Sequence, residues 1–150
     1  LHVTLAFLGD TPQEQVPFLV DAAQQTAMHN PPSVAPMTAL CGFPRVTRAT
    51  VLVVLLDDPE GQLIRLARTL SSHLRGLGLP GPDRDFRPHI TLARMKHPTR
   101  LEPWLSPFPL QYSPVRLDRL RLCSSDLGPQ GAIHSTLYEA PLAGAEPITP

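Results

Sequence analysis

The chain has 150 residues, the length of one ordinary domain, and its 42% hydrophobic content is enough to build a core. The formal charge is zero, from 13 basic and 13 acidic residues, which argues against a general nucleic-acid coat protein but not against a small basic cleft. No apolar run reaches bilayer length and no signal peptide opens the chain, so we expect no membrane partner. The two cysteines form no disulfide framework and suit a reducing compartment, which favours a cytoplasmic protein.

The first half of the chain contains three strand patterns and one helix pattern. The eight residues 49–56 are almost continuously apolar, which is typical of a central strand covered on both faces. Pro17 is awkward inside a helix and moves the expected helix start to about that residue. In chain order we predict a strand over 1–8, a helix from about Pro17 to Asn30, and strands over 34–43 and 49–56.

The second half contains one further helix and three further strands. Leucines recur at helical spacing after Asp58, and two glycines close the pattern. The remaining predictions, in order, are a helix from Asp58 to Gly76, a loop rich in Gly, Pro, Asp and Arg, a strand over 89–95, an irregular stretch over 97–109, and strands over 112–123 and 132–140. The order of elements predicts an α+β fold with mostly antiparallel strand pairing.

One short motif occurs twice, once near each end of the chain. Residues 2–7 read H-V-T-L-A-F, and residues 89–94 read H-I-T-L-A-R. Alternate residues of a strand share a face, so His2 and Thr4 point one way while their apolar neighbours point the other. His89 and Thr91 are arranged in the same way. Two such polar faces meeting across a cleft would offer two imidazoles and two hydroxyls to one ligand.

This set of side chains fits acid–base chemistry on an anion. Two imidazoles can supply one base and one acid near neutral pH, and threonine hydroxyls can donate hydrogen bonds to phosphate oxygens. Neither motif contains a carboxylate, which would repel a negative ligand, and no third histidine stands at a zinc-ligand spacing. The pattern indicates displacement at a phosphodiester, with no metal and no cofactor.

The sequence resembles the 2H phosphoesterases, and within them the bacterial and archaeal RNA 2′,3′-cyclic phosphodiesterases, also called 2′-5′ RNA ligases. The resemblance rests on H-V-T-L-A-F-L-G at 2–9 and R-P-H-I-T-L-A-R at 87–94, and more weakly on L-C-S-S-D-L-G at 122–128. It implies a bilobal, pseudo-twofold α+β domain with two mostly antiparallel sheets, helices outside and a central cleft. It also implies metal-independent hydrolysis of RNA 2′,3′-cyclic phosphate ends to 2′-phosphates, with 2′-5′ ligation as a related reaction.

The resemblance also assigns residues to the site. It implies that His2 and His89 are catalytic and that Thr4, Thr91 and Arg94 bind the substrate phosphate. Strand parity places Arg94 with the apolar residues, so it reaches the cleft only if the strand ends or twists there. By the same parity, Phe7 is a core residue or a wall on which a base stacks.

Further expectations concern the extent of the domain and its partners. Residues 1–150 are expected to form one two-lobed domain that lacks the strand and helix that precede the first motif in the family, which would leave apolar side chains such as Leu19 exposed. The expected partners are RNA ends or nucleoside 2′,3′-cyclic phosphates, bound by a monomer. Two alternatives stay open: a non-catalytic nucleotide-binding or RNA-binding module, and a metallohydrolase that uses His2 and His89.

The other histidines carry less weight. His97 and His134 could approach the cleft, whereas His29 and His73 fall late in the predicted helices and are expected at the surface or as helix caps.

Overall fold

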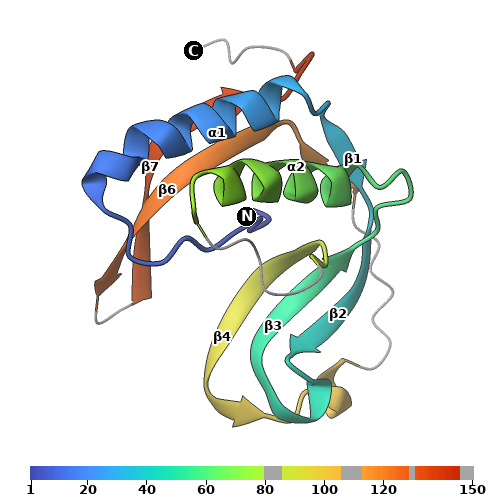
Figure 1. Ribbon diagram of the computed structural model, residues 1–150. Coiled ribbons are helices and arrows are strands. Elements are labelled where there is room, and N and C mark those ends of the chain that lie inside the picture. Colours follow the sequence, from blue (N-terminus) through green and yellow to red (C-terminus); the bar gives the residue numbers. More distant parts are fainter. Residues whose placement is uncertain (80–85, 106–112, 129–130, 146–150) are drawn as a thin grey trace.

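The computed structural model describes residues 1–79, 86–105, 113–128 and 131–145. Two helices lie side by side, and antiparallel strands extend beside and beneath them (Figure 1). The elements, in chain order, are η1 Gln13–Gln15, α1 Val16–Met28, β1 Ser33–Ala35, β2 Met37–Phe43, η2 Val46–Arg48, β3 Ala49–Leu56, α2 Gln62–Gly76, β4 His89–Thr99, η3 Glu102–Trp104, β5 Val115–Leu117, β6 Arg119–Gly128 and β7 Gly131–Pro141.

The strands form separate antiparallel sheets. Within the described ranges, one sheet has the order β2-β3-β4, and two smaller sheets pair β6 with β7 and β1 with β5. All of these pairs are antiparallel, which confirms the predicted α+β class. The predicted central strand is also confirmed, because β3 lies between β2 and β4 and buries Ala49, Val53 and Val54 almost completely.

The helices begin close to where the sequence predicts. Pro17 occupies the first turn of α1, where the missing N–H of proline has no helical partner to lose. The carboxylate of Asp58 accepts hydrogen bonds from the backbone N–H groups of Leu63 and Ile64, at 3.1 and 2.9 Å, and so caps α2. His73, on α2, is half-buried and bonds through Nδ1 to the hydroxyl of the fully buried Thr26 at 2.8 Å. It therefore links the two helices and is not a surface residue.

Among the described residues, the core has two parts, which correspond to two lobes. The first lies between α1, α2, β6 and β7, and the second between α2, β1, β3 and β4. The first contains Ala23, Ala27, Leu66, Leu120, Ala140 and Leu142. The second contains Ala35, Leu56, Leu63 and Ile90. Helix α2 contributes to both, so it joins the lobes.

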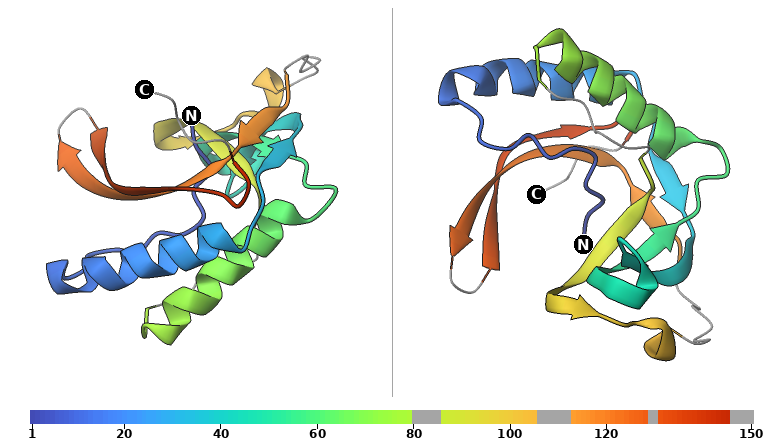
Figure 2. Two further views of the ribbon diagram at one scale, coloured as in Figure 1. Left: turned by 90° about the horizontal axis from the view of Figure 1, so that it is seen from above. Right: turned by 60° about the horizontal axis from the view of Figure 1, so that its bottom comes forward.

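Residues 1–8 do not form the predicted strand. Val3 makes an isolated β-bridge, and its neighbours form no regular element. The segment runs between the β6–β7 hairpin and β4, as Figure 2 shows. Val3 packs on the second core and Leu5 packs on the first. Because the segment crosses from one lobe to the other within a few residues, it cannot follow one neighbouring strand.

The remaining elements agree with the sequence predictions except in detail. β4 continues to Thr99, so the irregular stretch begins later than predicted. The Gly- and Pro-rich loop at 80–85, the last four residues (106–109) of the predicted irregular stretch and the turn at 129–130 fall outside the described residues. Leu19 is 4% exposed, so it is not among the apolar side chains open to solvent. In the part of the chain that the structure describes, we find no helix long and apolar enough to span a bilayer.

Candidate active site

The two His-x-Thr motifs lie next to each other and run in opposite directions. They meet at the antiparallel bridge between Val3 of the first motif and Ile90 of the second. Both bridge residues pack against the second core, and Ile90 is only 2% exposed. Since alternate residues of an extended segment point to opposite sides, the polar residues of both motifs face away from this core.

The bridge brings each histidine level with a threonine of the other motif. In an antiparallel pair, residues on either side of a bridge lie opposite one another in reverse order. His2 is therefore level with Thr91, and Thr4 is level with His89. Extended by one residue on each side of the bridge, this register would set the four side chains of the duplicated motif on one face.

Arg94 joins the same face because β4 contains a bulge. Between Thr91 and Ala93, two steps along β4 correspond to one step along β3, so Leu92 is an extra residue in the pairing. Arg94 then pairs with Val51, two residues along β3 from the partner of Thr91. Residues two apart on a strand share a face, and directly paired residues do as well. The parity that places Arg94 with the apolar residues therefore fails, and its exposed side chain belongs to the His89 face.

The ring of His89 is held by two neighbours. Its Nδ1 lies 2.7 Å from the backbone carbonyl oxygen of Arg87. A carbonyl only accepts, so Nδ1 carries a proton and neutral His89 presents the lone pair of Nε2. The ring of Phe43 meets the imidazole edge-on, with centroids 5.0 Å apart and an interplanar angle of 76°. The guanidinium carbon of Arg87 lies 5.4 Å from the Phe43 centroid, within cation–π range.

His2 has a different neighbour, the imidazole of His134 on β7. The two ring centroids are 5.9 Å apart and the interplanar angle is 72°. His134 is in turn bonded through Nδ1 to the hydroxyl of Ser125, on β6, at 2.7 Å. Partial burial lowers the pKa of His2 below its ordinary value, and the nearby imidazole of His134 and the amino group of Leu1 lower it further.

The remaining candidates take other places. Phe7 is 76% exposed, which excludes the core alternative and leaves the alternative that it is a wall on which a base stacks. His97 is exposed on β4, and His29 ends α1 and bonds to the carbonyl oxygen of Gln25 at 2.7 Å. Within the described ranges, no three His, Cys, Asp or Glu side chains gather as a metal ion would require.

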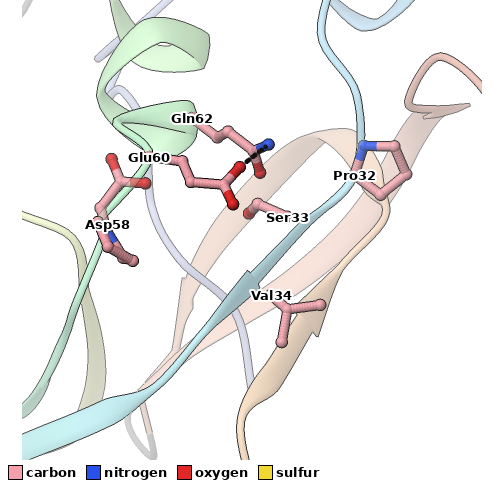
Figure 3. Close-up of a pocket in the computed structure, with 7 residues that line it drawn as sticks. Pro32, Ser33, Val34, Asp58, Glu60 and Gln62 are labelled. Atoms are coloured by element: carbon pink, nitrogen blue, oxygen red, sulfur yellow. Dashed lines mark hydrogen bonds between the residues drawn. The ribbon is translucent and has the colours of Figure 1, made fainter.

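Two shallow depressions lie away from the motifs. The one in Figure 3 has a volume of about 250 Å³ and is lined by Pro32, Ser33, Val34, Asp58, Pro59, Glu60 and Gln62. Its Asp58 carboxylate already caps α2, and its Glu60 accepts a hydrogen bond from Gln62. The other, of about 400 Å³, is lined by Pro44, Arg45, Thr47, Arg48, Thr50 and Pro98. Neither contains a motif residue, so the candidate site rests on the pairing of the motifs.

The sequence did not predict the ring contacts of the two motif histidines, Phe43 with His89 and His134 with His2. Phe43 carries no motif, and only the folded sheet brings it to His89. His134 stands among the weaker sequence candidates, and the signal that could have promoted it is the hairpin register that pairs it with Ser125.

The comparisons with known proteins place this chain and its fold in one family. The model of the 2′-5′ RNA ligase superfamily matches residues 1–129. The crystal structure of TT0787 of Thermus thermophilus superposes with a TM-score of 0.78 at 27% identity, over 97% of this chain and 79% of that one. Apo LigT of E. coli gives a TM-score of 0.70 at 23% identity, over 95% of this chain and 75% of that one, and shows the same fold. The chain belongs to the 2′-5′ RNA ligase superfamily, whose members are 2H phosphoesterases.

Curated relatives carry a more particular name. A protein of Thermus thermophilus, named RNA 2′,3′-cyclic phosphodiesterase, is 34% identical over 96% of this chain and 73% of its own length. A protein of Aeropyrum pernix with the same name is 28% identical over 96% of this chain and 83% of its own length. Within the superfamily, this chain therefore groups with enzymes of that name from bacteria and archaea.

Proposed function

We propose that the protein hydrolyses RNA 2′,3′-cyclic phosphate ends to 2′-phosphates without a metal ion. The observation that carries the proposal is the Val3–Ile90 bridge, which sets the two His-x-Thr motifs against one another on one face. The relatives that share the name RNA 2′,3′-cyclic phosphodiesterase support the choice of substrate. The cellular compartment that fits this role is the cytoplasm, where RNA is processed.

The reaction needs a proton removed on one side of phosphorus and a proton supplied on the other. Water attacks phosphorus, the bond from phosphorus to the 3′ oxygen breaks, and the product carries a 2′-phosphate and a 3′-hydroxyl. The attacking and leaving oxygens stand in line on opposite sides, so two groups share the work. His89 and His2, in oppositely directed motifs, would serve one side each.

His89 is the proposed base. Its Nδ1–H donates a hydrogen bond to the carbonyl oxygen of Arg87. In the neutral form, the lone pair of Nε2 can therefore accept the proton of the attacking water. If the 5′-hydroxyl of a second RNA takes the place of water, the same step forms a 2′-5′ bond. Hydrolysis and ligation thus differ only in the nucleophile.

His2 is the proposed acid, which gives its proton to the departing 3′ oxygen. This role requires the charged imidazolium, whereas burial and His134 lower the pKa of His2 in the empty site. The negative charge of a bound cyclic phosphate acts in the opposite direction and favours the imidazolium. The acid role of His2 therefore depends on bound substrate.

The threonines and Arg94 are the proposed anion contacts. By the register of the Val3–Ile90 bridge, Thr4 and Thr91 would share a face with the histidines and donate hydrogen bonds to the non-bridging oxygens, where charge grows in the transition state. The guanidinium of Arg94 can contact two oxygens at once.

The test is product analysis in excess EDTA. The protein is incubated with a nucleoside 2′,3′-cyclic phosphate and, separately, with an RNA oligonucleotide that ends in one. We expect a 2′-phosphate from both, a large loss of rate in His2→Ala and in His89→Ala, and an unchanged rate in the control His97→Ala. Loss of the wild-type activity in EDTA would favour a metallohydrolase. Binding without turnover would favour a non-catalytic module, and a 3′-phosphate product would contradict the proposed reaction.

A further inference from the structure

Each motif histidine is met edge-on by a ring from a distant part of the chain. Phe43 meets His89 with an interplanar angle of 76°, and His134 meets His2 with an angle of 72°. The centroid distances are 5.0 and 5.9 Å, both within the range of edge-to-face contacts. The two halves of the site are therefore alike in geometry.

The two partner rings differ in chemistry. Phe43 carries no ionisable proton, whereas His134 is an imidazole. His134 is fixed by the 2.7 Å contact between its Nδ1 and the Ser125 hydroxyl, and these two residues lie opposite one another in the β6–β7 pair. Its Nε2 edge is not used by that contact. Because the ring partner of His2 is ionisable and the ring partner of His89 is not, the symmetry of the two motifs is broken at His2.

We propose that His134 is a positioning residue of the active site, which holds the imidazole of His2 edge-on. When His134 is protonated, its positive charge opposes protonation of His2. Two adjacent imidazolium groups repel, so the empty site favours at most one proton charge on the pair. A bound phosphate anion relieves this repulsion and lets His2 become charged. The effect on turnover rests on the proposed function; the coupling between the two rings does not.

Among the described residues, few ionisable groups lie around the pair of His2 and His134. The ionisable groups that act on His2 are His134 from β7 and the amino group of Leu1 from its own segment. From β4, the residue level with His2 is Thr91, which does not ionise. Asp126 follows Ser125 on β6, and it pairs with Ile133 and so lies on the other face of the hairpin. Burial lowers the pKa of His2 most, and His134 is the ionisable side chain that lowers it further.

The experiment is a titration of His2 by proton–carbon NMR in the wild type and in two variants. His134→Phe reproduces the Phe43 arrangement: it keeps a ring beside His2 but removes the charge. His134→Ala removes both. We expect the pKa of His2 to rise in both variants relative to the wild type, and to stay unchanged in the control His97→Phe. An unchanged pKa of His2 in His134→Phe overturns the proposal.

Kinetics separate the positioning effect from the charge effect. With the cyclic mononucleotide, we expect His134→Phe to keep kcat within a few-fold and His134→Ala to lose about 10- to 100-fold, as displaced catalytic groups do. Ser125→Ala, which frees the His134 ring, should fall between them. Equal kcat in His134→Ala and the wild type overturns the positioning role. Failure of the wild type to open the cyclic phosphate would instead overturn the proposed function. The NMR titration of His2 would still test the electrostatic effect of His134 on His2.

Discussion

Arg94 shares a face of the sheet with Thr91, although the two residues are an odd number of positions apart. The cause is the bulge at Leu92, an extra residue that reverses which face of the sheet the following residues of β4 point to. Arg94 is one of those following residues. The bulge thus adds the guanidinium of Arg94 to the face that carries His89 and Thr91.

We expect Arg94→Ala to lower kcat/KM for the cyclic phosphate by about 10- to 100-fold, because a hydrogen bond to a charged group contributes about 1.5–3 kcal/mol. The matched control is Arg75→Ala, an exposed arginine in the last turn of α2 that belongs to neither motif. Steady-state kinetics of the two variants check this. Equal small losses from both would remove Arg94 from the site.

The roles of the two histidines can be separated by the leaving group. We expect His2→Ala and His89→Ala each to lose on the order of 10²- to 10⁴-fold with the natural substrate, the usual range for a positioned acid or base. A substrate whose leaving group needs no proton should restore turnover to His2→Ala and not to His89→Ala. Rescue of His89→Ala instead would reverse the assignment.

The pH dependence follows from the lowered pKa of His2. An acid must be charged, so activity that depends on His2 falls as the pH rises through its pKa. Because that pKa is lowered in the free protein, we expect the alkaline limb of the kcat/KM profile to lie at a lower pH than an unperturbed imidazole would give.

The kcat profile reports the substrate-bound protein, and its alkaline limb should lie at higher pH because the bound anion stabilises the imidazolium. Rates measured across the pH range with saturating and subsaturating substrate check both limbs. Coincident limbs in the two profiles would contradict the effect of the anion. A profile with a single ionisation would contradict the two-histidine mechanism.

A stability prediction concerns Gly42, next to Phe43. A Cβ at this position would lie 2.7 Å from the Cβ of Ala49 and 3.1 Å from a methyl carbon of Leu101. We expect Gly42→Ala to lower the free energy of unfolding by about 1–3 kcal/mol through overpacking. Gly76→Ala is the control, because a Cβ there meets nothing within 4 Å, and it should raise that free energy by up to about 1 kcal/mol. Urea denaturation of both variants measures the difference.

Much of the fold and the two His-x-Thr motifs of the site follow from local sequence patterns. The long apolar strand, both helices and the polar faces of the two motifs depend on periodicity and on helix-capping residues, which act over a few neighbours. The place of Arg94 depends on a bulge, and a bulge is a property of the pairing between strands. The contact of Phe43 with His89 depends on the pairing of β2, β3 and β4, and the contact of His134 with His2 depends on where residues 1–8 lie between the lobes. No local pattern carries that information.

The single bridge between Val3 and Ile90 has a consequence for local stability. A segment tied to its neighbour by few backbone hydrogen bonds opens at a lower free energy than the core strands. We expect the amide protons of the N-terminal motif to exchange with solvent before those of β3, while the remaining structure stays folded. Catalytic competence would then be lost by subglobal unfolding at denaturant concentrations below the main transition, and a bound phosphate ester, by bridging both motifs, would suppress that early step.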